Sequence, residues 1–165
     1  MSNAAGFIDK ISSYLERITA AILIVLVMII VYDASMRFAF SQGSIMLQEL
    51  EWHLFDIIML ISITVTSKYN QHVRVDIFYH NFSEDKQALI QLLGHLFMVI
   101  PFSLLIIIVG LDYVQMSFMQ MEGSANPDGL PFRYLIKSMM VLGFVFLILQ
   151  AIGEIIQYKV KRDKQ

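Results

Sequence analysis

Apolar residues in this chain are concentrated in four long segments that are separated by shorter polar stretches. An α-helix needs about 20 residues to cross the hydrocarbon core of a bilayer, and each segment is long enough to do so. The pattern therefore predicts one all-α integral membrane domain over residues 1–165, with four transmembrane helices in a bundle. The expected spans are residues 17–40, 45–67, 87–116 and 130–158, joined by loops that include 68–86 and 117–129.

Composition agrees with this interpretation. Hydrophobic residues make up 57% of the chain and charged residues only 16%, whereas soluble domains carry roughly 25% charge. No basic patch suits nucleic acid. The absence of cysteine excludes disulfides, thiolate metal sites and cysteine nucleophiles. No cleavage site of the A-x-A type follows the first apolar segment, so it is expected to be a retained span rather than a signal peptide.

The distribution of lysine and arginine predicts the orientation of the bundle. Cytoplasmic loops of membrane proteins carry an excess of these residues. With both termini and loop 68–86 in the cytoplasm, nine basic residues lie inside and three lie near the outer side. This arrangement places loop 117–129 in the periplasm. The inner group is Lys10, Arg17, Lys68, Arg74, Lys86, Lys159, Lys161, Arg162 and Lys164, and the outer group is Arg37, Arg133 and Lys137.

The second span begins with a polar face. In the stretch QELEWHLFDII, four side chains fall within an arc of about 100° on a helix: Glu49, Trp52, His53 and Asp56. Glu49 is close to the outer headgroups, where water can still reach it. Asp56 lies ~15 Å further in, where an unpaired charge costs at least ~2.5–3.5 kcal/mol. Asp56 is therefore expected to be protonated, paired, or covered by protein or water.

Basic partners for this face are available on the fourth span. Arg133 and Lys137 are four residues apart and share one helix face, and Lys137 is deep enough to meet Asp56 or Glu49. Asp33 and Arg37 make a similar pair on the first span. We expect the polar face to serve in pairing between helices or in docking another subunit.

Other chemistry receives less support from the residues. A b-type haem needs two histidines at matching depth, and His53 and His95 are predicted at different depths. The Glu-x-x-His pairs of di-metal bundles are absent, as are phosphate loops and hydrolase motifs. The third span has no acid between Gln87 and Leu111, so no chain of carboxylates crosses the membrane. No catalytic, cofactor or metal site is predicted. The alternatives left open are a four-helix redox anchor for haem or quinone and a stand-alone small transporter.

Proline and glycine residues predict where the helices end or bend. Asn126-Pro127-Asp128-Gly129 is typical of a turn, and Pro131 suits the first position of the last helix. Pro101 is expected to free the carbonyl of Phe97 and to bend the third helix. The middle loop alternates apolar and charged residues, which indicates either a segment at the membrane interface or a docking surface for a partner.

Three motifs together resemble a known family, the small membrane subunit of tripartite ATP-independent periplasmic (TRAP) transporters. Their order and spacing match across about 45–158, although Val141 stands where the family often has proline. The motifs are Gln48-Glu49-Leu50-Glu51-Trp52, then His72-Val73-Arg74-Val75-Asp76, then Pro131-Phe132-Arg133 with Lys137-Ser138 and Leu142-Gly143-Phe144.

The resemblance implies a function. It implies an accessory subunit in the bacterial inner membrane that pairs with a large multi-span permease, which carries the substrate and sodium sites. A soluble periplasmic receptor would deliver an organic acid. The small subunit would brace the immobile scaffold of the large one and help the receptor to dock. On this interpretation His72, Arg74 and Asp76 form the family's motif loop, the partners are proteins and lipids, and the chain is not an enzyme.

Overall fold

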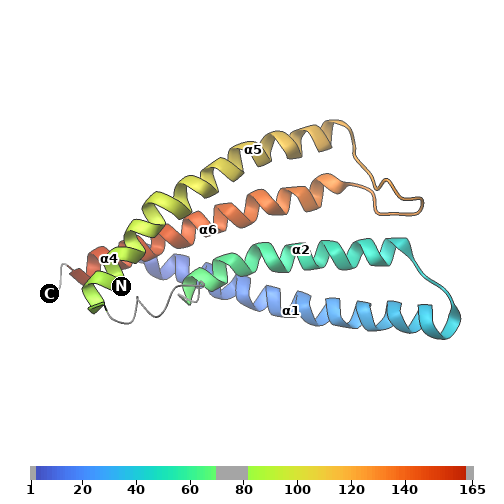
Figure 1. Ribbon diagram of the computed structural model, residues 1–165, viewed down its shortest axis with the longest axis horizontal. Coiled ribbons are helices and arrows are strands. Elements are labelled where there is room, and N and C mark those ends of the chain that lie inside the picture. The colour runs from blue at the N-terminus through green and yellow to red at the C-terminus, as the bar shows by residue number, and fades with distance from the viewer. Residues whose placement is uncertain (1–2, 70–81, 163–165) are drawn as a thin grey trace.

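The computed structural model describes residues 3–69 and 82–162, and the described part of the chain is helical outside its loops (Figure 1). The π-helical segment η1 joins α4 and α5 without a break, so these three elements make one long helix. The elements are α1 (Asn3–Phe40), α2 (Ile45–Lys68), α4 (Glu84–Gly94), η1 (His95–Val99), α5 (Ile100–Met119) and α6 (Arg133–Arg162).

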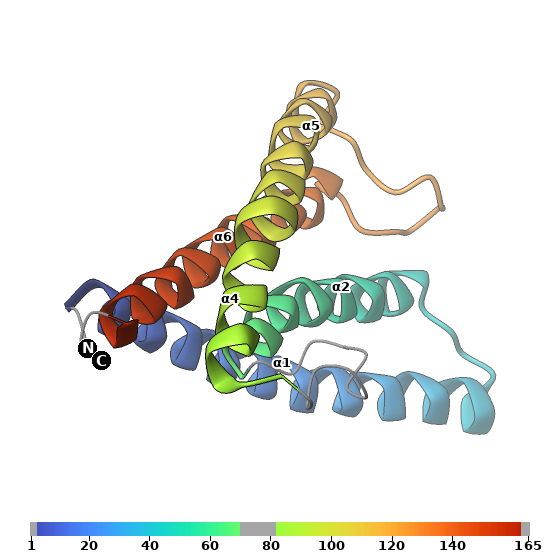
Figure 2. The same ribbon diagram turned by 60° about the vertical axis from the view of Figure 1, so that its left-hand side comes forward.

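The last helix, α6, holds the bundle together. It packs against α5, α2 and α1, while α1 and α2 form a hairpin of their own. Both termini lie at one end of the bundle, and the connections 41–44 and 120–132 lie at the opposite end (Figures 1 and 2). We call these the terminal end and the loop end.

Four stretches of the described helices are long and apolar enough to cross a membrane: Ala5–Phe40, Ile45–Lys68, Lys86–Met119 and Arg133–Val160. Their outer surfaces are rich in exposed apolar side chains. Ile24 and Ile108, for example, are each 64% exposed. This confirms the predicted all-α membrane fold with four spanning helices. The first helix begins earlier than the expected span because Ala5, Ser12 and Leu15 bury one side of its first turns.

Small residues let the helices approach closely. A Cβ atom on Gly143 would lie 3.1 Å from the Cβ of Leu60, and one on Gly110 would lie 3.0 Å from the side chains of Met140 and Val141. In lipid, helix association depends on such packing rather than on a hydrophobic driving force. Gly143 therefore sets the contact of α6 with α2, and Gly110 sets the contact of α5 with α6.

The disturbance expected near Pro101 takes the form of a π-helical turn. The N–H of Ile100 donates to the carbonyl of His95, five residues earlier, and Pro101 follows with no N–H to donate. The wider turn places His95 on the side of the helix that faces α6, where it is 8% exposed.

Polar side chains are buried in two layers near the two ends of the bundle. Glu49 contacts Arg133 at the loop end, and Ser67 contacts Glu154 at the terminal end. About 27 Å of helix separates Glu49 from Ser67 on α2, close to the ~30 Å thickness of a bilayer's hydrocarbon core. The two layers therefore match the two boundaries of the membrane interior.

Candidate functional site

The polar face of α2 begins with Glu49, whose carboxylate organises the loop end. The helix starts at Ile45, capped by Ser44, whose Oγ accepts from the N–H of Leu47 at 3.3 Å. One turn later Glu49 is only 6% exposed. Its oxygens accept hydrogen bonds from groups of the 120–132 connection and from α6: Ser124 Oγ, Asn126 Nδ2 at 3.1 Å, Leu130 N at 2.7 Å and Arg133 Nη2 at 3.3 Å.

Although its position near the headgroups allows contact with water, Glu49 is covered by protein. The connection between α5 and α6 folds over the start of α2 and replaces water with its own donors. This connection is closed by two backbone bonds, from Ser124 N to Leu130 O at 3.0 Å and from Arg133 N to Glu122 O at 2.8 Å. Glu49 thus joins α2 to α6 through an ordered loop.

Lys137 completes the loop-end layer on its other side. Its ammonium donates to the carboxylate of Glu122 and lies 4.0 Å from the ring centroid of Tyr113. The hydrogen bond from Lys137 holds the pKa of Glu122 below its usual value. The side chain of Lys137 therefore points toward α5 and the loop.

The contact expected between Lys137 and Asp56 is consequently not formed. Asp56 is exposed, and within residues 3–69 and 82–162 no hydrogen bond or ion pair reaches it. Arg133 binds Glu49 instead of Asp56, at 3.3 Å. Asp56 lacks these partners because the side chains of Arg133 and Lys137 point elsewhere, and their spacing in the sequence could not predict these directions.

The predicted polar stripe on α2 thus divides in two. Glu49 belongs to the buried loop-end layer. Trp52, which is 71% exposed, and Asp56 stand on the free surface of the helix, beside Met59 at 53% exposure, while His53 is half-buried. The pair predicted on α1 is confirmed, with Arg37 Nε 2.9 Å from Asp33 Oδ2 and Asp33 buried.

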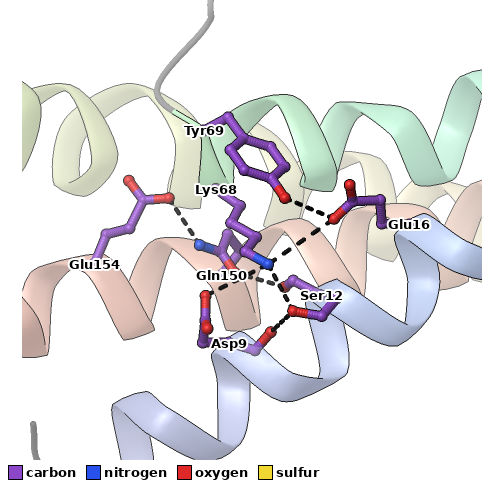
Figure 3. Close-up of polar contacts among 8 residues, drawn as sticks. Asp9, Ser12, Glu16, Lys68, Tyr69, Gln150 and Glu154 are labelled. Carbon is purple, nitrogen blue, oxygen red and sulfur yellow. Dashed lines mark hydrogen bonds and ion pairs between the residues drawn. The ribbon is translucent and has the colours of Figure 1, made fainter.

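A second polar network at the terminal end was not predicted from the sequence. Glu154 is its centre: Oε1 accepts from Ser67 Oγ and Gln150 Nε2, each at 3.0 Å, and Oε2 lies 2.7 Å from His95 Nε2. Gln150 in turn accepts from Ser12 Oγ at 2.6 Å. Figure 3 shows how α1, α2 and α6 meet here. The spacing of Gln150 and Glu154, four apart in an apolar span, was the signal available.

Beside this network, Lys68 ties the end of α2 to α1 (Figure 3). Its Nζ lies 2.7 Å from Ser13 Oγ and 3.6 Å from Asp9 Oδ1. Tyr69 donates to a carboxylate oxygen of Glu16 at 2.8 Å, and this bond raises the pKa of Tyr69. The terminal end is thus held by the hydrogen bonds around Glu154 and by the cluster of opposite charges around Lys68.

The remaining sequence expectations concern histidines and the middle loop. His53 lies one turn from Glu49, whereas His95 belongs to the terminal-end layer, so these two are not placed to bind one haem. His72, Arg74 and Asp76 lie outside the described residues.

Comparison with known proteins places these features in a family. The family model for tripartite ATP-independent periplasmic transporters, DctQ component, matches residues 26–158. No curated protein matches the chain. The matched region includes both halves of the polar stripe, the loop-end layer and most of α6. DctQ proteins are components of a transporter rather than enzymes, and they work with a large permease and a periplasmic receptor. The chain belongs to the DctQ family, the small permease component of TRAP transporters.

Proposed function

We propose that this chain braces the scaffold of a large permease subunit in a sodium-coupled, receptor-dependent transporter for an organic acid. The transporter would sit in the bacterial inner membrane. The observation that supports a docking role most directly is Asp56, an exposed carboxylate in a membrane-spanning helix. An unpaired charge at such a depth costs ~2.5–3.5 kcal/mol on insertion scales. A partner subunit that pairs with Asp56 would remove this cost.

Two exposed side chains flank Asp56 on the same face of α2. Trp52 lies one turn before it and Met59 follows it, and both are exposed on the isolated chain. Aromatic side chains and methionine are enriched at protein interfaces. We assign the face of Trp52, Asp56 and Met59 as the docking face for the large subunit, which would supply a basic or hydrogen-bonding group opposite Asp56.

The two polar layers suit a bracing role. Glu49 holds the loop end and Glu154 holds the terminal end, so the helices are tied at both boundaries of the membrane interior. Such ties favour a rigid body over one that moves during transport. No substrate site is assigned to this chain, and sodium and the organic acid would bind the large subunit.

The orientation follows the positive-inside rule. With nine basic residues against three, we place the terminal end in the cytoplasm and the loop end in the periplasm. Ala125, Asn126, Pro127 and Asp128 are exposed at the tip of the 120–132 connection, while Glu49 binds Ser124 and Leu130 on either side of this tip. This ordered tip would offer the periplasmic receptor a landing surface.

Co-expression with a large TRAP permease subunit from the same source tests the proposal. The tagged chain should retain the large subunit through purification in mild detergent. Asp56→Leu should reduce the retained fraction, whereas Met59→Leu, which keeps an apolar side chain on the same face, should not. A wild-type chain that purifies without any large subunit would contradict the accessory role. Equal retention by Asp56→Leu would contradict only the assigned face.

A further inference from the structure

The outer face of α1 near the terminal end combines two aromatic and two basic side chains. Phe7, Lys10, Tyr14 and Arg17 are all exposed, Phe7 to 65% and Tyr14 to 67%. Their spacings of three and four residues place them within an arc of about 80° on the helix. We call these four residues the α1 basic face. Within residues 3–69 and 82–162, the side chains of Lys10 and Arg17 form no ion pair or hydrogen bond.

The acidic side chains of the same helical turns face the interior of the bundle. Asp9 and Glu16 point toward the end of α2, where Lys68 Nζ lies 3.6 Å from Asp9 Oδ1 and 4.0 Å from Glu16 Oε2 (Figure 3). Tyr69 also donates to Glu16 at 2.8 Å. The negative charges of these turns are therefore bound within the chain, whereas the positive charges of Lys10 and Arg17 are left on the outer surface.

The α1 basic face lies at the boundary of the membrane interior. Ser12 belongs to the terminal-end layer, because its Oγ donates to Gln150 at 2.6 Å. Phe7 and Lys10 precede Ser12 and lie outside this layer, while Arg17 lies ~8 Å further in. Side chains on a helix lean toward its N-terminus, which here is the direction of the headgroups. Arg17 can therefore extend its guanidinium outward to the level of Lys10.

The same side of α1 continues into the membrane as an apolar surface. Ala21, Ile24 and Met28 follow Arg17 at spacings of four, three and four residues, and all three are exposed, Ile24 to 64% and Met28 to 65%. One side of the helix thus presents positive charge at headgroup level and apolar side chains below it. This sequence of surfaces matches a phospholipid, whereas a free phosphate ion would contact only the basic part.

We propose that the α1 basic face binds an anionic phospholipid, such as phosphatidylglycerol, in the leaflet at the terminal end. Lys10 and Arg17 would hold the phosphate, and the planar guanidinium of Arg17 can donate two hydrogen bonds to it. Phe7 and Tyr14 would lie at the headgroup level, where aromatic side chains are enriched. In phosphatidylcholine a quaternary ammonium group cancels the phosphate charge, so the face should prefer the anionic lipid.

The test uses the full chain in nanodiscs and exploits its lack of cysteine. Ala21→Cys carries a fluorophore just below the α1 basic face, and Leu105→Cys carries the same fluorophore on the exposed surface of α5. Brominated phosphatidylglycerol or brominated phosphatidylcholine then quenches each label. At Ala21, the anionic lipid should bind at least about fivefold more strongly than phosphatidylcholine, and added salt should reduce this preference. At Leu105 the two lipids should quench equally.

Two double variants separate this face from the total charge of the chain. Lys10→Gln with Arg17→Gln should reduce the preference at Ala21 to about one. Lys86→Gln with Lys159→Gln removes the same charge from exposed positions on α4 and α6 and should retain the preference. Equal quenching by both lipids in the wild type, or an equal loss in both double variants, would overturn the proposal. If the first double variant does not fold, a salt-independent preference in the wild type would overturn it.

A large subunit that covered this side of α1 would give a different result. In a complex purified with the large subunit, quenching at Ala21 by the anionic lipid should persist. Loss of quenching by both lipids there would show that a protein occupies the face, and the lipid assignment would be wrong. The measurements on the isolated chain do not depend on the accessory role, so their failure would leave that role unaffected.

Discussion

The carboxylate of Glu49 accepts a hydrogen bond of 2.7 Å from the backbone N–H of Leu130, which lies 81 residues further along the chain. This contact links the start of α2 to the connection before α6, and three further donors converge on the same carboxylate. A charged acceptor with several donors makes stronger bonds than a neutral one. Glu49 is therefore the residue on which the order of the loop end depends.

Replacing Glu49 by alanine should release the 120–132 connection. The N–H of Leu130 and the amide of Asn126 would lose their acceptor, so hydrogen exchange at the Leu130 amide should accelerate by roughly tenfold or more. Exchange measured by mass spectrometry on peptides that cover the connection would show this. Glu51→Gln is the matched control, because Glu51 points to the other side of α2, and it should leave exchange at Leu130 unchanged. Unaltered exchange in Glu49→Ala would mean that the loop is ordered without this carboxylate.

The pair of Glu122 and Lys137 should make the loop end sensitive to acid. Lys137 donates to Glu122 and lowers its pKa from the usual value of 4.5. A depressed carboxylate pKa contributes stability that is present above the unfolded value and is lost as the pH falls through the folded value. Protection of the Arg133 amide, which donates to the carbonyl of Glu122, should therefore fall only when the pH drops below about 4.5. Protection here means the intrinsic exchange rate at each pH divided by the observed rate.

Glu122→Gln provides the comparison for this effect. Without an ionisable group at this position, protection at Arg133 should be lower near neutral pH and should change little on acidification. If the variant and the wild type respond equally to acid, another carboxylate controls the loop.

The fold was accessible from the sequence because a membrane imposes simple rules. The lengths of the apolar segments predicted four spans, and the i,i+4 spacing of Asp33 and Arg37 predicted their ion pair. Helical phase alone could not decide which way Lys137 turns, because that depends on where α5 and the 120–132 connection lie. The same limit hid the burial of Glu49, since the covering segment lies 81 residues away.

Sequence signals for the helix start were misleading where the preceding loop adopts an unusual backbone conformation. Pro131 was expected at the first position of α6, but the helix begins at Arg133 because Phe132 adopts a positive φ of 62°. The turn at 126–129 was predicted correctly, with Gly129 N donating to Asn126 O at 3.2 Å. The network around Glu154 was missed because its members come from four elements, and only packing brings them together.

Close helix packing predicts the effect of side chains at glycine positions. Gly143→Ala would place a Cβ 3.1 Å from both the Cβ and the carbonyl oxygen of Leu60, which cannot move without shifting the backbone of α2. Overpacking of this kind costs about 1–3 kcal/mol, so the midpoint of thermal unfolding in detergent should fall. Gly94→Ala is the control, since a Cβ there meets nothing within 4 Å, and it should stabilise the helix by up to about 1 kcal/mol. A midpoint for Gly143→Ala equal to the wild-type value would show that α6 does not rely on this contact.

A set of double substitutions tests the separation of Lys137 from Asp56. Lys137 binds Glu122, and Asp56 has no ion-pair partner in the described part of the chain. Effects of distant groups add, whereas those of paired groups do not. The losses in unfolding free energy caused by Asp56→Leu and Lys137→Leu should therefore sum in the double variant to within about 0.5 kcal/mol. Lys137→Leu with Glu122→Leu should be less damaging than the sum of the single losses. Urea unfolding in mixed micelles measures the five variants and the wild type under one condition. Non-additivity between Asp56 and Lys137 would reinstate a direct pair, and Asp56 would then be satisfied without any partner subunit.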